Sequence, residues 1–106
     1  MKKIFVLLAL ALTANFALSA DVVGNAAAAK DKVSMCIGCH GIEHYRTNFP
    51  EVYRVPMLGG QNAKYLESAL KEYRKGGRTH PTMDGIATSL SDQDIADVAA
   101  YYSQQK

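Results

Sequence analysis

Apolar residues recur at helical spacing in two stretches of the chain, which predicts two amphipathic helices. The first helix is predicted from about residue 62 to 75, where Gly76-Gly77 stops it, with an apolar stripe at Ala63, Leu66, Ala69, Leu70 and Tyr73. The second is predicted to begin at a capping box of Ser91 and Asp94 and to run to about residue 103, with a stripe at Ile95, Val98, Ala99 and Tyr102.

The other segments predict one more helix and two loops. Strong helix formers follow Asn25, a suitable cap, and predict a helix from about residue 26 that runs into the sequence SMCIGCHG at 34–41. Prolines and glycines mark 41–60 as a long loop, which in so small a domain is expected to be functional, and 77–85 as a second loop. Because no period-2 apolar run is long enough to indicate a sheet, the predicted fold is all-α, with four or five short helices.

The first twenty residues have the pattern of a secretory signal peptide. Lys2 and Lys3 precede an apolar run from Ile4 to Leu12, and small residues end at Ala20, so the expected mature domain is 21–106. A retained membrane anchor is the alternative, but the run is short for a bilayer span. We therefore expect export and a periplasmic location.

Net charge gives no indication of a nucleic-acid partner. The 106-residue chain has a formal charge of +2, and the two lysines of the signal account for this excess, so the rest of the chain is neutral. A domain of this size buries a modest core and usually needs a disulfide, a metal or a prosthetic group to be stable. This requirement directs attention to the chain's two cysteines.

Both cysteines belong to the motif CIGCH, formed by Cys36, Cys39 and His40. A disulfide over so short a loop would stabilise the fold little. A structural zinc site would need a second ligand pair, and only His44 and His80 are left for it. A thioredoxin-like dithiol would follow a strand in an alternating strand and helix pattern, which the chain does not show.

Covalent attachment of a c-type haem is the interpretation that this spacing favours. On a helix, residues at i, i+3 and i+4 project from one face, so two thiols can bond the porphyrin edge while the imidazole of His40 reaches the iron. One covalently held haem would then replace the missing core. Without it, the chain is expected to be mostly unfolded.

The second axial ligand of the iron decides between an electron carrier and a protein with an open iron site. Met83 is the favoured candidate because it lies 43 residues after His40, far enough along the chain to reach the other side of the haem. His80, Met57 and an open position remain alternatives. The other ring nitrogen of His40 needs an acceptor, for which a backbone carbonyl near Pro56 is expected.

These motifs resemble the small bacterial class I cytochromes c. CIGCH is similar to the attachment motif, VPMLGGQNAKYLESALKEYRKGGR to the segment leading into the middle helix, and MDGIATSLSDQDIADVAAYYSQQ to the axial methionine and C-terminal helix. The resemblance implies thioether bonds at Cys36 and Cys39, iron ligation by His40 and Met83, and acceptance from His40 by the Pro56 carbonyl. The loop with His44 and Tyr45 departs from the family pattern, so their role is open.

The resemblance implies a one-electron carrier, not an enzyme, with a transient redox protein donor and acceptor. Two alternatives are a haem subunit of a larger dehydrogenase and a peroxidase or gas-binding protein with an open distal site. Lysines at helical spacing, Lys64, Lys71 and Lys75, could steer an acidic partner, although internal pairing such as Glu67 with Lys71 is the expected arrangement.

Overall fold

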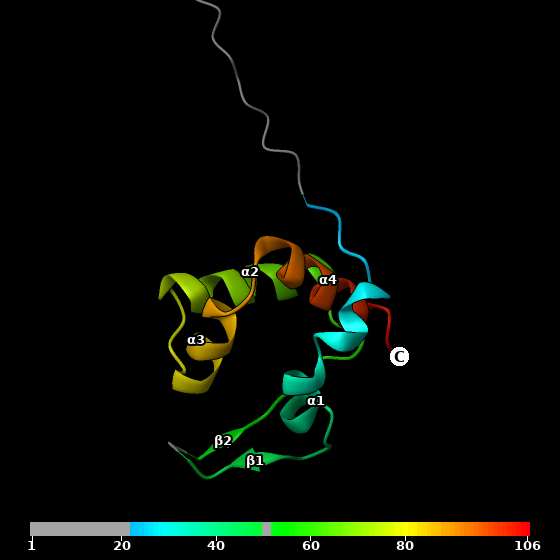
Figure 1. Ribbon diagram of the computed structural model, residues 1–106. Helices are drawn as coiled ribbons and strands as arrows, with labels where there is room; N and C mark the ends of the chain where they lie inside the picture. Colours follow the sequence, from blue (N-terminus) through cyan, green and yellow to red (C-terminus); the bar gives the residue numbers. More distant parts are fainter. Residues whose placement is uncertain (1–21, 50–51) are drawn as a thin grey trace, which may run out of the picture.

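The computed structural model describes residues 22–49 and 52–106, and within them most of the regular structure is helical (Figure 1). The helices are the 3-10 helix η1 (Ala28–Asp31), α1 (Ser34–His40), α2 (Ala63–Lys75), α3 (Pro81–Thr88) and α4 (Asp92–Ser103). Two short strands, β1 (Arg46–Thr47) and β2 (Tyr53–Arg54), form an antiparallel hairpin. The all-α prediction is confirmed apart from this hairpin, and the predicted signal peptide lies outside the described residues.

Helices α2 and α4 begin and end where the sequence predicts. The Asn62 side chain accepts a hydrogen bond from the Tyr65 backbone N–H at 3.0 Å, and α2 ends at Gly76, whose φ of 88° is left-handed. At the start of α4, Ser91 and Asp94 exchange side-chain and backbone hydrogen bonds as a capping box. These local signals fix both ends of α2 and the start of α4.

The helix predicted from about residue 26 is wrong as one continuous element, because η1 and α1 are separated by Lys32 and Val33. Asn25 does accept hydrogen bonds from the backbone N–H groups of Ala27 and Ala28. At the break, the Lys32 ammonium lies 2.6 Å from Asp94 of α4, and Val33 is buried in the core. The turn between η1 and α1 thus holds the N-terminal segment against α4.

The loop predicted at 77–85 is also wrong in part, because its second half belongs to α3. Pro81 occupies the first turn of α3, where its fixed φ favours the helix and its missing N–H costs nothing. His80 caps the helix, since its Nδ1 accepts from the backbone N–H of Met83 at 3.5 Å. Met83 is therefore presented by a helix.

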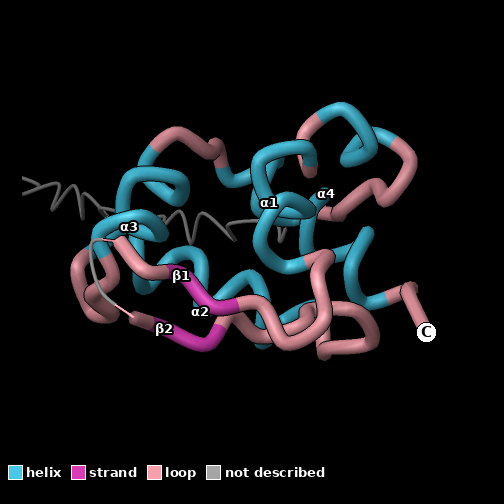
Figure 2. The backbone as a smooth tube through the Cα atoms, turned by 90° about the horizontal axis from the view of Figure 1, so that it is seen from below, coloured by secondary structure: helices cyan, strands magenta, loops and turns pink. Residues whose placement is uncertain are grey.

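The core lies where η1, α2 and α4 meet. Its buried apolar residues are Ala29, Val33, Leu66, Val98, Ala99 and Tyr102. Figure 1 shows α1 and α3 on opposite sides of the molecule, with α2 and α4 above them, and the view from below in Figure 2 shows the hairpin across the lower side. No helix within the described ranges has the length and apolar character needed to cross a membrane.

One carboxylate is buried beside this core. Asp97 of α4 is 2% exposed and accepts hydrogen bonds from the Asn25 backbone, the Lys32 ammonium and the Gln93 amide, at 2.7–2.8 Å. Burial acts to raise the pKa of Asp97, but the hydrogen bonds outweigh it, so the pKa lies below its ordinary value. Asp97 thereby joins the N-terminal segment to α4.

Replacing Asp97 by Ala is expected to lower the free energy of unfolding by about 2–3 kcal/mol, because the three donors lose a buried acceptor. The lowered pKa also means that this stabilisation is complete above the ordinary Asp pKa of about 3.9 and is lost as the pH falls through the folded-state value. Denaturant unfolding between neutral and acid pH measures both effects. An Asp97→Ala chain with the wild-type acid dependence would contradict this role.

Candidate functional site: a haem cavity between two helices

Helix α1 brings the three residues of the CIGCH motif to one cavity. Cys36, Cys39 and His40 lie at positions i, i+3 and i+4 of this short helix, and all three line the same cavity. The two cysteines are not joined in a disulfide. The two thiols and the imidazole therefore face one space, as the helical spacing predicts.

The cavity has a volume of about 370 Å³, within the range of cofactor sites. Its wall is mainly apolar and includes, from α2, α3 and α4, the side chains Leu66, Ala69, Leu70, Tyr73, Met83, Ile86 and Val98. The described lining residues include Arg54 and Arg78 but no carboxylate. These features suit a flat apolar ring that carries carboxylate groups, as haem does.

A short hydrogen bond positions the His40 imidazole. Its Nδ1 lies 2.6 Å from the backbone carbonyl oxygen of Pro56. Since a carbonyl can only accept, Nδ1 must carry the proton and donate it, which leaves the lone pair on Nε2. The imidazole is thus oriented and kept in the tautomer that can bind a metal.

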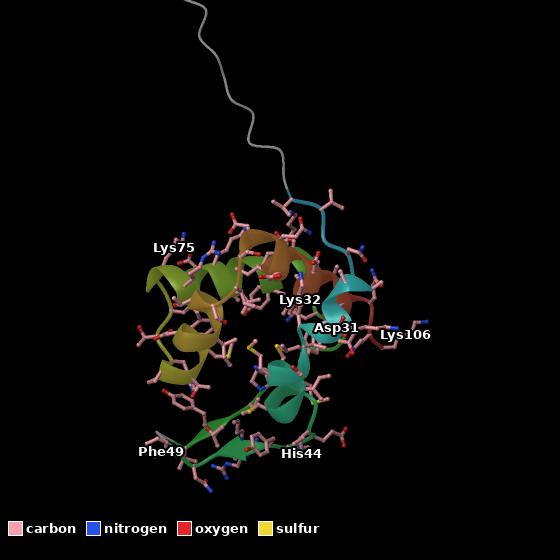
Figure 3. All side chains as sticks on the ribbon, viewed as in Figure 1. Asp31, Lys32, His44, Phe49, Lys75 and Lys106 are labelled. Atoms are coloured by element: carbon pink, nitrogen blue, oxygen red, sulfur yellow. The ribbon has the colours of Figure 1, made fainter. Side chains whose placement is uncertain are left out.

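Of the candidates for the second ligand, Met83 lines the cavity from α3, the helix that lies across from α1 (Figure 1). Figure 3 shows sulfur atoms gathered in the space between these two helices. His80 also lines the cavity, but its Nδ1 caps α3 and its ring packs edge-on against Tyr53, with centroids 4.6 Å apart. Met57 lines the cavity as well, but it follows Pro56, whose carbonyl accepts from His40, and it is 52% exposed.

The other interpretations of the cysteines find little support in the geometry. Burial, with a smaller contribution from Cys39, raises the pKa of Cys36, whereas a reactive dithiol has a lowered thiol pKa. Among the described residues, no three His, Cys, Asp or Glu side chains are arranged to hold a metal ion. The cavity, with a thioether on one side and an imidazole on the other, agrees with neither alternative.

Several cavity residues were not anticipated from the sequence. Thr47, Tyr53 and Arg54 of the hairpin line the lower part of the cavity, although they lie in the predicted loop. Tyr102 of α4 also reaches the wall, and burial raises its pKa to about 12, so the phenol is neutral at any physiological pH. The signals were the apolar stripe of α4 for Tyr102 and, for the hairpin residues, only the general expectation that the long loop is functional.

The lysines of α2 are internally paired. Glu67 lies 3.5 Å from Lys64 and 4.0 Å from Lys71, and Lys75 lies 2.8 Å from Glu72. The expectation of internal pairing is confirmed, with Glu67 shared by two lysines, so the three lysines are only partly compensated by two carboxylates.

Comparisons with known proteins agree with this site. The cytochrome c family model matches residues 24–106. Cytochrome c-554(548) of Halomonas halodenitrificans is 46% identical over 86 residues, which cover 78% of this chain and 99% of that protein. Cytochrome c4 of Pseudomonas aeruginosa is 40% identical over 94% of this chain and 48% of its own length.

A solved structure gives the same result for the fold. Reduced cytochrome c4 from Pseudomonas stutzeri superimposes with a TM-score of 0.64 and 36% identity, over 79% of this chain and 47% of that chain. The chain thus spans about half the length of its cytochrome c4 relatives. The helices have the class I cytochrome c arrangement, and the chain belongs to the cytochrome c family, whose single c-type haem it holds covalently through Cys36 and Cys39.

Proposed function

We propose that this protein is a periplasmic one-electron carrier whose haem iron is bound by His40 and Met83. The observation that carries the proposal is the cavity itself, which is bordered by the CIGCH face of α1 and by the thioether of Met83 on α3. When bound, the haem supplies a one-electron couple between Fe(II) and Fe(III).

The protein's contribution is to orient and enclose this group. Donation from His40 to the Pro56 carbonyl fixes the imidazole and raises its basicity as a ligand. The apolar wall of the cavity keeps water from the metal, and a thioether ligand in such surroundings favours the reduced state relative to a second imidazole. The apolar surroundings and the thioether ligand each predict a comparatively high reduction potential.

Binding by Met83 would also leave no open position on the iron for enzyme chemistry. With protein ligands on both sides, no position is left for a substrate or a diatomic gas. The cap that His80 gives to α3 supports this arrangement, because it fixes the first turn of the helix that carries Met83. Electrons would then be exchanged with donor and acceptor proteins that dock briefly over a small surface.

A spectrum of the oxidised, exported protein tests the proposal. A weak sulfur-to-iron charge-transfer band in the far red and a low-spin spectrum are expected when the Met83 thioether binds. A high-spin spectrum without this band would instead indicate an open iron position, and carbon monoxide would then bind readily to the reduced form. Mass analysis of the same material checks that the chain begins at Asp21.

A further inference from the structure

Arg78 lies at the wall of the haem cavity, on the segment that joins α2 to α3 (Figure 1). The turn that ends α2 sets its position, because the backbone N–H groups of Gly77 and Arg78 both donate to the Glu72 carbonyl, at 2.9 and 3.2 Å. Gly76 allows this turn through its left-handed φ of 88°. Since Arg78 is exposed, it lies where the cavity wall meets the solvent.

Two tyrosines of α2 hold the Arg78 guanidinium in place. Its Nη2 donates to the Tyr65 hydroxyl at 3.1 Å, and its central carbon lies 5.6 Å from the Tyr65 ring centroid and 5.8 Å from that of Tyr73. Both distances are within cation–π range, and both tyrosines line the same cavity. The guanidinium is therefore oriented by the fold itself, which reduces the entropy cost of binding a ligand.

The hydrogen bond to Tyr65 uses only part of the donor capacity of the Arg78 guanidinium. A guanidinium presents its N–H groups as a planar fork that matches a carboxylate, and such charge-assisted pairs are stronger than neutral hydrogen bonds. The group that this cavity receives, a c-type haem, carries carboxylates at its edge. Lys75, in contrast, lies 2.8 Å from Glu72 and outside the described cavity lining.

We propose that Arg78, positioned by the Tyr65 hydroxyl, binds a carboxylate of the haem. The positive charge of Arg78 beside the ring favours Fe(II) over Fe(III), because reduction removes a positive charge from the iron. The same charge holds the carboxylate ionised, since an opposite charge nearby stabilises the charged form. The proposal goes beyond the carrier function, because it needs the haem but not ligation by Met83.

The test compares Arg78→Gln with Lys75→Gln, two exposed positions near the end of α2 that each lose one positive charge. The reduction potential of each holoprotein is measured at about 0.1 M salt. At a fixed applied potential, we expect the ratio of reduced to oxidised protein to fall about fivefold in Arg78→Gln and less than about twofold in Lys75→Gln. The haem methyl NMR signals of oxidised Arg78→Gln should also titrate at higher pH, because the carboxylate has lost its partner.

The other titratable or charged side chains of the cavity wall are the same in both variants, so their titrations cancel in the comparison. Besides the CIGCH motif, the described lining contains Tyr53 and Arg54 of β2, Tyr65 and Tyr73 of α2, His80 before α3, and Tyr102 of α4. Arg54→Gln is therefore measured as well, to separate the two arginines of the wall.

Tyr65→Phe isolates the positioning role, because it keeps the ring and removes only the hydroxyl. We expect the same ratio to fall about twofold in Tyr65→Phe alone and not to change when Tyr65→Phe is added to Arg78→Gln, since both changes act through one contact. Arg78→Lys keeps the charge without the planar fork and should give an intermediate fall. It also supplies the comparison if Arg78→Gln does not fold.

Equal potentials and equal haem methyl titrations in Arg78→Gln and Lys75→Gln would overturn the proposal and leave Arg78 as a packing residue between two tyrosines. A fall found in Arg54→Gln but not in Arg78→Gln would assign the carboxylate to the hairpin. Additive effects of Tyr65→Phe and Arg78→Gln would refute the positioning role of Tyr65. The far-red band tests ligation by Met83 separately, so its absence from the wild-type protein would leave this comparison intact.

Discussion

A chain in which both Cys36 and Cys39 are replaced by Ser is expected to be largely unfolded and colourless. Its described buried apolar residues include four alanines, and the cavity walls contribute Leu70, Tyr73 and Ile86 toward a space that the haem fills. Without the ring, these side chains would face water, and their burial would no longer offset the chain entropy. We expect the loss of the whole stability, typically about 5–15 kcal/mol for a domain.

Far-UV circular dichroism and thermal unfolding of the exported chain measure this loss. The single variants Cys36→Ser and Cys39→Ser each keep one thioether site and should retain a folded, coloured fraction, which separates loss of the haem from loss of a thiol. A colourless double variant that keeps native helix content and unfolds cooperatively would show that the polypeptide has a sufficient core of its own.

The parts of the fold that the sequence predicts correctly are those set by local signals. Helix α2 begins after Asn62 and ends at Gly76, and α4 begins at the Ser91 capping box, because each cap uses side chains within four residues of the helix end. The CIGCH motif is local in the same sense. Two cysteines and a histidine on one helical turn need no tertiary information to share a face.

What the sequence could not predict depends on contacts between distant segments. The hairpin strands have two residues each, too short for an alternating pattern, and the break before α1 is held by Lys32 at α4. Asp97 lies outside the apolar stripe of α4 and is buried only because the N-terminal segment, through Asn25, covers it. Pro81, which lies in the loop predicted at 77–85, instead begins α3, since proline favours the first turn of a helix.

Replacing Met83 by Ala is expected to keep the haem and the fold but to change the iron site. Cys36 and Cys39, which hold the haem, lie on α1, and His40 contacts Pro56, so none of these contacts involves α3 and the variant should be exported and coloured. Removing a side chain from the cavity wall should cost about 2 kcal/mol or more of unfolding free energy. Loss of the thioether should abolish the far-red band, lower the reduction potential and let the reduced protein bind carbon monoxide.

Met57→Ala is the matched control, because it removes the same side chain from a half-exposed position beside Pro56. Optical spectra, potentiometry and carbon monoxide titration of both variants separate a ligand from a packing residue. We expect Met57→Ala to keep the far-red band and to exclude carbon monoxide. If the band instead survives in Met83→Ala and disappears in Met57→Ala, the iron is bound from the chain segment beside Pro56, and the role assigned to α3 is wrong.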